Sequence, residues 1–318
     1  MKHLIMVGAC YLDTILTVPH FPEEDAKLRA TSLKKRRGGN CGNSLEVLQQ
    51  LVPPDLVALH LVTVLPSRRS AATETVLSSF GAGRSAAAVD FSQCIHREDQ
   101  TEAASSFIVR SQATGSRTIV NHNELAEMTV DEFVRVAKAF EDNAADTWWH
   151  FEGRIPETTD KCIQHLRHHL PQSRVSVEVE RPGREGLRKL AMEADVVFYS
   201  RTWAEGEGYA TAGDCLMGEV APKASLLLST WGARGACAIT PPSREVLHVE
   251  PVSDLAVQIV DAVGAGDTFI AGVMYGLLCR SGDWDVENTV RFAVDLATTK
   301  IQQDGFEGLG SKRPPAAV

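Results

Sequence analysis

Short apolar segments alternate with helix-patterned segments along most of this 318-residue chain, and this alternation constrains the fold more than any other feature. The apolar segments are bounded by turn residues, which predicts strands buried on both faces, over residues 3–8, 57–65, 147–153, 174–180, 194–200 and 224–230. Apolar residues at helical spacing predict helices over residues 43–51, 129–143 and 156–170. The alternation therefore predicts an α/β fold with right-handed crossovers, in which helices flank a mostly parallel central sheet.

Two segments interrupt the pattern. Residues 26–37 and 104–121 alternate polar and apolar residues, and the sequence ATGS at 113–116 supplies a turn inside the second segment. A small sheet with one solvated face, built from about residues 14–37 and 104–121, could project from the main domain as a lid. An ordinary solvated hairpin explains the pattern equally well. We expect one domain over residues 1–310 and a flexible tail over residues 311–318.

The charge balance argues against two classes of partner. The chain has 32 Lys and Arg against 41 Asp and Glu, a net charge of −9, and no long basic run offsets this. Nucleic acids and anionic membrane surfaces are therefore poor partners. A small anionic substrate remains possible, because backbone dipoles and a few arginines can create a local positive site.

The cysteines and the N-terminus indicate a cytoplasmic protein. Seven cysteines are scattered along the chain without a C-x-x-C pair, which favours reduced thiols. The N-terminal apolar segment reaches Asp13 too early for a signal peptide, and no apolar run is long enough to span a bilayer.

The segment VDAVGAGDTF at 260–269 places Gly264, Ala265 and Gly266 directly before Asp267 at the start of a predicted helix. Small residues at this point let backbone amides approach an anion, and the helix dipole adds about half a positive charge. Asp267 alone is consistent with a simple helix cap. A carboxylate beside a bound phosphate is costly unless it reacts, and accepting a proton from an attacking hydroxyl would be such a reaction. The motif indicates phosphoryl transfer.

A second motif, RRGGNCGNS at 36–44, joins the predicted lid to the first predicted helix. Its paired glycines allow close approach to a ligand, and Asn40 and Asn43 offer amide donors and acceptors suited to hydroxyl groups. A plain turn with Asn40 as the helix cap accounts for the same residues. Asp13 follows the first strand, at the edge of a parallel sheet where such folds bind ligands.

Together these motifs identify the chain as similar to the ribokinase-like (PfkB) family of carbohydrate kinases over about residues 3–310. Within the family it most resembles the ketohexokinase branch, on the segments HFEGR at 150–154, RVSVEVERP at 174–182 and DGFEGL at 304–309. The resemblance implies an ATP-dependent kinase that phosphorylates a small sugar, a ketohexose such as fructose at its 1-hydroxyl, with Mg²⁺. It also implies a homodimer held together through the β lid.

The resemblance assigns roles to individual residues. Asp267 would be the general base, and Gly264, Ala265 and Gly266 would form the anion hole for the migrating phosphoryl group. The sugar would be held by Asp13, Asp25, Gly39, Asn40 and Asn43, with Asp25 reaching in from a neighbouring subunit. The nucleotide would be contacted by Arg117, Arg201, Gly232, Gly235, Gly264 and Gly266.

Three departures from the family pattern leave details open. Residues 200–203 read SRTW where many members carry an Asn-x-x-Glu motif near magnesium, which the ketohexokinase branch also lacks. Ala233 and Arg234 replace an acidic pair, so a nucleotide contact through these side chains is left open. Val263 stands where Thr is common, so a K⁺ site near Asp261 is left open as well.

For several further polar residues the sequence allows both a structural and a functional interpretation. Glu152 and Arg154 could form a surface ion pair or line the sugar site. Glu178 and Glu180 lie on one face of a predicted strand and could organise hydrated magnesium or form structural salt bridges. The histidines at 165, 168 and 169 are expected to be a solvated helix face, with no dedicated metal ligand among them, and Cys41 is expected to be a small filler.

Two alternative functions remain at this level. A kinase of the same family could act on ribose, a nucleoside or 2-keto-3-deoxygluconate. A chain of another class could be a catalytically silent sugar- or nucleotide-sensing protein, although a sensor has no use for a carboxylate against phosphate. A dinucleotide-dependent oxidoreductase is disfavoured, because MVGACYLD at 6–13 lacks G-x-G-x-x-G.

Overall fold

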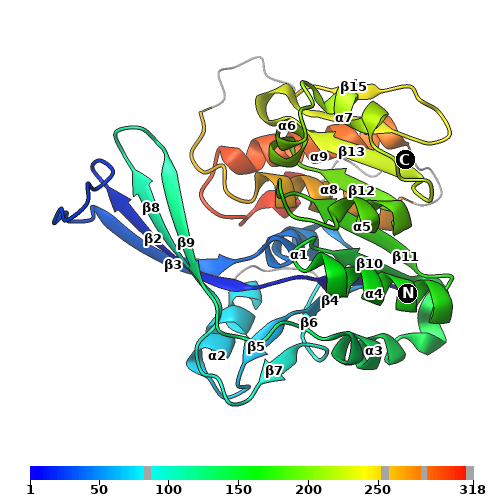
Figure 1. The fold of residues 1–318 in the computed structure, drawn as a ribbon, viewed down its shortest axis with the longest axis horizontal. Coiled ribbons are helices and arrows are strands. Elements are labelled where there is room, and N and C mark those ends of the chain that lie inside the picture. The colour runs from blue at the N-terminus through cyan, green and yellow to red at the C-terminus, as the bar shows by residue number, and fades with distance from the viewer. Residues whose placement is uncertain (82–86, 252–257, 281–284, 313–318) are drawn as a thin grey trace.

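The computed structural model describes residues 1–81, 87–251, 258–280 and 285–312. Most of the predicted tail at 311–318 lies outside these residues. A nine-stranded sheet forms the centre of the molecule (Figure 1). Its order is β15 (Leu247–Val249), β14 (Ala236–Ile239), β13 (Leu226–Thr230), β12 (Val196–Tyr199), β11 (Arg174–Val179), β10 (Thr147–Phe151), β1 (Lys2–Val7), β4 (Val57–Val62) and β6 (Val89–Asp90).

The strands from β6 to β13 pair in parallel, and only β14 and β15 at one edge pair antiparallel. The predicted mostly parallel α/β sheet is therefore confirmed. Parallel strands are covered on both faces, which explains their nearly continuous apolar sequences.

Helices cover both faces of the sheet. One core cluster joins the sheet to α1 (Asn40–Leu51), α8 (Ala265–Cys279) and α9 (Val286–Ile301). The other joins it to α3 (Val130–Lys138), α4 (Pro156–His169), α5 (Leu187–Glu193) and α7 (Ala212–Gly218). The short helices α2 (Ala71–Ser78) and α6 (Arg201–Gly206) follow β5 and β12. No helix in the described part of the chain has the length and apolar character needed to cross a bilayer.

Two predicted elements have different ends in the structure. The predicted strand 57–65 is two strands, because the chain leaves the central sheet after Val62 and β5 (Val64–Pro66) pairs with β7 (Ile95–Arg97) instead. The predicted helix 129–143 ends at Lys138 and continues as a separate 3₁₀ segment, Glu141–Asp146, in which Asn143 has a non-helical backbone.

A separate four-stranded sheet projects from the central sheet, on the left of Figure 1. It contains β3 (Ser32–Gly38), β2 (Tyr11–Val18), β8 (Ser105–Ser111) and β9 (Arg117–His122) in that order. The predicted projecting sheet is present, and its first strand begins at Tyr11 instead of near residue 14. We call this sheet the lid.

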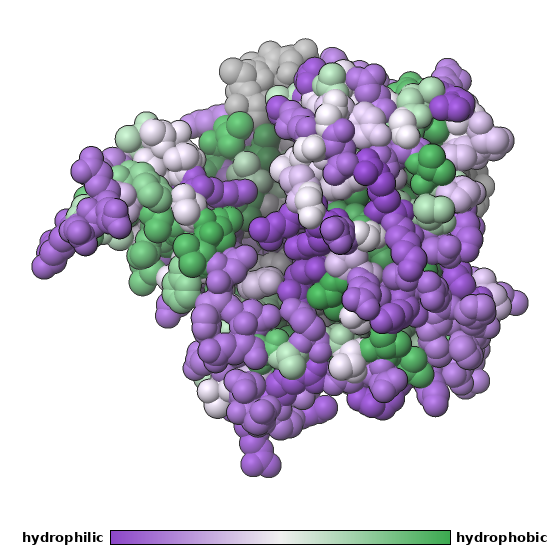
Figure 2. Space-filling view, viewed as in Figure 1, coloured by the Kyte–Doolittle hydropathy of each residue, from purple (hydrophilic) through white to green (hydrophobic). Residues whose placement is uncertain are grey.

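The pairing register separates the two faces of the lid. Leu33 pairs with Leu16, and Phe107 pairs with Val120, so these apolar residues share one face. The opposite face carries Asp13, Arg36 and other polar residues, together with some apolar ones. Figure 2 shows hydrophobic side chains gathered on the lid, where Leu33, Phe107 and Val120 are about half exposed or more. One face of the lid is thus an exposed apolar surface.

Candidate active site

Asp267 lies in the first turn of α8, which begins at Ala265 after the left-handed cap residue Gly264. Its side chain is buried, and Oδ2 accepts a hydrogen bond of 2.7 Å from Nδ2 of Asn43. The Ser44 hydroxyl donates to the backbone carbonyl of Asp267 at 3.0 Å. The two sequence motifs, more than 200 residues apart, therefore meet at one carboxylate.

Burial raises the pKa of Asp267 well above its ordinary value, and the nearby carboxyl of Glu178 raises it further. The hydrogen bond from Asn43 opposes this effect. Asn43 is itself fixed, because its Oδ1 accepts from Nη1 of the buried Arg37 at 3.1 Å. A carboxylate that holds a proton more tightly is a stronger base, so this setting suits proton abstraction.

We call residues 36–44, which the resemblance assigns to sugar binding, the sugar motif. Asn40, the first residue of α1, connects this motif to β11. Its Nδ2 donates to Oε2 of Glu178 at 2.8 Å and to Oε2 of Glu180 at 2.9 Å. Asn40, both glutamates, Gly266 and Asp267 line one cavity of about 90 Å³. The two carboxylates thus converge beside Asp267, and oxygen ligands of this kind fit Mg²⁺.

Gly264 and Gly39 adopt backbone angles that favour glycine, with φ of 80° and 106°. A Cβ on Gly264 would overlap the ring of Phe306, and one on Gly39 would overlap the carbonyl of Ala9. Around Gly266, in contrast, a Cβ would meet nothing within 4 Å. The start of α8 is therefore closely packed behind Gly264 and open in front of Gly266, which leaves backbone amides accessible to an anion.

A larger cleft of about 590 Å³ adjoins this cavity, and the two share Thr230, Gly266 and Phe269. Gly232, Ala233 and Gly235 also line the cleft, beside the apolar side of α9. Arg201, at the start of α6, lies beside the loop that contains Gly232. Its guanidinium is 5.8 Å from the centre of the Trp231 ring and adjoins Gly232. The structure thus brings together the residues predicted to flank the nucleotide, with Arg117 as the exception.

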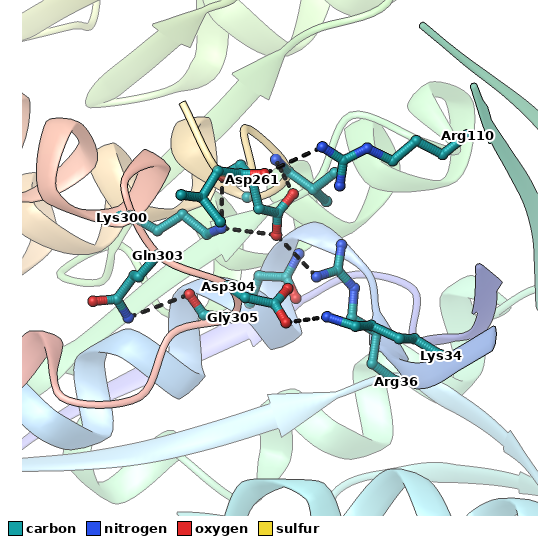
Figure 3. A network of polar contacts seen from close by, with 12 residues as sticks. Lys34, Arg36, Arg110, Asp261, Lys300, Gln303, Asp304 and Gly305 are labelled. Carbon is teal, nitrogen blue, oxygen red and sulfur yellow. Dashed lines mark hydrogen bonds and ion pairs between the residues drawn. The ribbon is translucent and has the colours of Figure 1, made fainter. Parts of the chain in front are cut away.

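Polar contacts tie the lid to the segment before α8 (Figure 3). Asp261 accepts from Nη1 of Arg36 on β3 at 3.1 Å and from Nζ of the fully buried Lys300 at 3.0 Å. Lys34 pairs with Asp304, and Nη2 of Arg110 donates to the carbonyl of Val260 at 3.3 Å. Cationic side chains of β3 and β8 therefore hold the lid against the loop before α8 and the loop after α9. We call this network the lid clasp.

Asp13 is buried on the lid face that carries Arg36. Burial raises the pKa of Asp13, against the opposing effects of the Ser106 hydroxyl and of Arg36. A Cβ on Gly38 would come within 2.5 Å of Asp13 Oδ2, so Asp13 lies directly against the glycine pair of the sugar motif. Asp13 on β2, Gly39 before α1, and Asn40 and Asn43 in the first turn of α1 therefore surround one corner of the site, which we call the sugar corner.

Two predicted ligands lie apart from this corner. Asp25 is exposed, in a turn with φ of 62° between β2 and β3. Arg117 is exposed at the start of β9, and its charge acts on Asp13 only as a minor influence. Neither residue lines the cavity that contains Asp267 or the larger cleft beside it, so their assigned roles stay predictions.

The structure defines the contacts of Glu152, of Arg154 and of the histidines on α4. Arg154 pairs with Glu127, whereas Glu152 is half-buried and accepts from the backbone N–H of Ala9 at 2.9 Å. Burial raises the pKa of Glu152 to about 7. A simple Glu152–Arg154 surface pair is therefore not what the structure shows. The rings of His165 and His169 stack at 4.2 Å on α4, with His169 exposed.

Sequence reasoning missed three residues that organise the site: Arg37, His150 and Lys300. Arg37 was visible within RRGGN, but its buried contacts to Asn43 and Glu46 come from the fold. His150 is buried and lies 3.0 Å from Oε1 of Glu178 on the neighbouring strand. A lysine at an apolar position of α9 was the one local signal that could have pointed to Lys300.

Known proteins resemble this chain over nearly its whole length. The family model for pfkB family carbohydrate kinase matches residues 1–308. The chain belongs to this family. Ketohexokinase of Mus musculus is 31% identical over 326 residues, covering 97% of this chain and 99% of that protein.

Solved structures confirm the ribokinase-like fold. Ribokinase from Giardia lamblia superposes on this PfkB chain with a TM-score of 0.74 and 15% identity, covering 99% of this chain and 97% of that one. Ribokinase from Cryptococcus neoformans in complex with ADP has a TM-score of 0.70 and 15% identity, covering 97% and 96%. At these identities the likeness establishes the fold, and the family assignment makes the chain a sugar kinase.

Proposed function

We propose that this kinase transfers the γ-phosphoryl group of ATP to the 1-hydroxyl of a ketohexose such as fructose. The observation that carries the proposal is the position of Asp267, a buried carboxylate at the amino end of α8 that the sugar motif holds through Asn43. The same carboxylate borders a cavity that Asn40 also lines. This cavity adjoins the larger cleft at Gly232 and Gly235. The likeness to ketohexokinase supports the choice of acceptor.

In the proposed mechanism, Asn40, Asn43 and Asp13 orient the sugar, and the lid closes over it. Asp267 accepts the proton of the attacking hydroxyl, which makes the oxygen a better nucleophile as it approaches the phosphorus. The amides of Ala265 and Gly266, with the dipole of α8, stabilise the charge that develops on the phosphoryl oxygens. Holding both reactants in line supplies much of the rate enhancement.

The residues present suit the partners of a sugar kinase. The cleft at Gly232, Gly235 and Gly266 is large enough and apolar enough on one side for an adenosine group. Glu178 and Glu180 would hold Mg²⁺, which neutralises phosphate charge when bound. A K⁺ site near Asp261 stays a prediction, and there the ammonium of Lys300 already donates to the backbone carbonyl and side chain of Asp261.

We further propose a homodimer through the apolar face of the lid and a cytoplasmic location. The exposed Leu33, Phe107 and Val120 support the dimer, because exposed apolar clusters of this kind commonly mark interaction surfaces. All seven cysteines are free thiols, which fits a reducing compartment.

The Asp267→Asn variant tests the general base. We expect turnover to fall by at least ~10²-fold with ATP binding largely intact, because the change removes the base and little volume. Asp214→Asn is a matched control, since Asp214 also lies in the first turn of a helix, α7, and should keep full turnover. Wild-type turnover in Asp267→Asn would refute the assignment.

A coupled ADP-release assay across ketoses, aldoses and nucleosides tests the acceptor. We expect the highest kcat/KM with a ketohexose and release of a 1-phosphate ester. A clear preference for ribose, a nucleoside or 2-keto-3-deoxygluconate would favour the other family activities, and no turnover with any acceptor would favour a sensing protein.

A further inference from the structure

Three side chains with metal-ligating atoms meet behind the sugar corner. They are Cys41 on α1, His150 on β10 and Glu178 on β11, and all three are buried. One ligand atom from each lies within 4.8 Å of the other two, and Nε2 of His150 is 3.0 Å from Oε1 of Glu178. A thiol, an imidazole and a carboxylate from three separate elements therefore converge on one point.

The neighbours of these ligands hold them as outer-shell groups hold ligands in metalloproteins. Nδ1 of His150 lies 2.9 Å from the hydroxyl of Ser176, which also accepts from Nε1 of Trp148 at 2.9 Å. The second oxygen of Glu178 accepts from Asn40 at 2.8 Å. A partner on the far nitrogen of a histidine fixes the ring and directs the other nitrogen to the metal.

Gly8 leaves space beside the thiol. A Cβ on Gly8 would come within 2.6 Å of Sγ of Cys41 and 2.7 Å of Oε2 of Glu152. The absence of a side chain at Gly8 therefore lets Cys41 and Glu152 approach the same region.

The region has an excess of acidic groups. Glu178 and Asp267 are buried and Glu152 beside them is half-buried, and the charge of Glu178 raises the pKa of both Glu152 and Asp267. Two arginines of this region have other partners, since Arg154 pairs with Glu127 and Arg37 pairs with Glu46. A bound dication would relieve this repulsion.

We propose that Cys41, His150 and Glu178 form a binding site for a borderline-soft divalent cation of the Zn²⁺ type. Zinc takes Cys, His and carboxylate ligands at about 2.0–2.3 Å in a tetrahedron, so its ligand atoms lie about 3.3–3.8 Å apart. Because no two of the ligand atoms are more than 4.8 Å apart, a shift of at most about 1 Å would bring the wider spacings to this geometry. Three protein ligands leave the fourth position for water.

This site differs in chemistry from the proposed Mg²⁺ site. Magnesium prefers oxygen ligands and keeps several waters, whereas the thiol and imidazole select softer ions. Glu178 belongs to both sets and also holds Asn40. A zinc-type ion would therefore draw Glu178 away from the sugar corner and inhibit the reaction, a consequence that rests on the proposed kinase function.

The binding test uses tag-free protein and Co²⁺ alone, without sugar or nucleotide, so its outcome does not depend on kinase activity. We expect tetrahedral d–d bands and a thiolate-to-cobalt charge-transfer band that saturate at about one equivalent. Zn²⁺ should displace the cobalt and abolish both bands. The absence of a saturable charge-transfer band would overturn the proposal.

Matched cysteine variants locate the site. Cys41→Ala should lose the charge-transfer band, and Cys279→Ser, a change at a half-buried cysteine on α8, should keep it. The reverse pattern would overturn the proposal. X-ray absorption of zinc-loaded wild-type protein gives a measurement that needs no variant: one sulfur at about 2.3 Å with nitrogen and oxygen ligands supports the site, and a shell of oxygen and nitrogen alone contradicts it.

Discussion

At the scale of single residues, the candidate site depends on charges placed where water is scarce. Asp267 and Glu178 are buried in one cluster of carboxyl side chains. Only a few hydrogen-bond donors, such as Asn43 and Asn40, stabilise the charged forms of these carboxyls. Desolvation and like charge both favour the protonated carboxyl, so these carboxyls hold their protons more tightly than exposed carboxyls do. Its chemistry follows from location as much as from residue type.

Gly264 provides a test of the anion hole. Gly264→Ala introduces a methyl group at a φ of 80° and against the ring of Phe306. We expect it to lower both turnover and the free energy of unfolding, the latter by about 1–3 kcal/mol. Gly183→Ala is the control, because Gly183 has a φ of 71° with nothing within 4 Å of a Cβ. Equal losses in chemical denaturation of the two variants would show that the Phe306 contact costs nothing.

Lys300 provides a second test. Its ammonium is fully buried and donates to the carbonyl and carboxylate of Asp261. We expect Lys300→Met to lower the free energy of unfolding by about 3 kcal/mol, because breaking a buried pair leaves the carboxylate poorly compensated. Lys161→Met is the comparison at the exposed pair with Glu157, where little or no loss of unfolding free energy is expected. Similar urea midpoints for both variants would contradict this.

At the residue scale, sequence reasoning found the groups that lie within local motifs. Asp267, Asn40 and Asn43 stand in short glycine-containing segments whose backbone requirements are visible in one window of sequence. Lys300 and His150 could not be found in this way, because their importance comes from partners brought near by sheet pairing and helix packing. The role of a buried polar residue can be assigned only when its hydrogen-bond or ion-pair partner is known.

At the scale of elements, caps define helix ends more sharply than apolar spacing does. Helix α3 begins with a capping box, in which Thr129 and Glu132 satisfy each other's backbone N–H groups. It ends at Lys138, although apolar residues continue at helical spacing to Phe140. The prediction of one strand over 57–65 was wrong at its C-terminal end for a related reason. An apolar sequence does not show which sheet its last residues join.

The cap of α3 also predicts a pH effect. The Arg97 guanidinium holds the pKa of Glu132 down to about 2, below its ordinary value of 4.5. A carboxyl with a lowered folded-state pKa stabilises the fold above pH 4.5, and this contribution disappears as the pH falls toward 2.

We therefore expect Glu132→Gln to reduce the acid sensitivity of unfolding. Because solvent partly screens the pair, the difference from wild type should be about 1 kcal/mol at pH 6 and should vanish near pH 2. Denaturation curves at a series of pH values measure it. A difference that stays constant with pH would show that the charge of Glu132 is not what stabilises the helix.

At the scale of the whole molecule, the sequence predicted the central sheet well because parallel strands are buried on both faces and read as apolar runs. The antiparallel edge strands β14 and β15 were not predicted, since they are only four and three residues long. The lid was predicted as a small sheet, but which of its faces meets the site follows only from the register.

The register leads to a test of the proposed dimer. Val120 lies on the apolar outer face of the lid, whereas its neighbour Ile119 pairs with Ile108 on the face that carries Arg36 and Asp13. We expect Val120→Glu to give monomers in sedimentation velocity and Ile119→Glu to leave dimers intact. Monomeric wild-type protein, or dissociation by both variants alike, would contradict an interface on this face.

The lid is assembled from two excursions of the chain, residues 11–38 and 105–122, and the parallel pairing of β2 with β8 stitches them together. Everything between them, from α1 through β7, belongs to the body of the molecule. Each excursion supplies only two of the four lid strands. An evolutionary or engineered exchange of the lid between kinases must therefore transfer both segments together. Substrate range in such chimaeras should therefore change only when the two pieces come from the same parent.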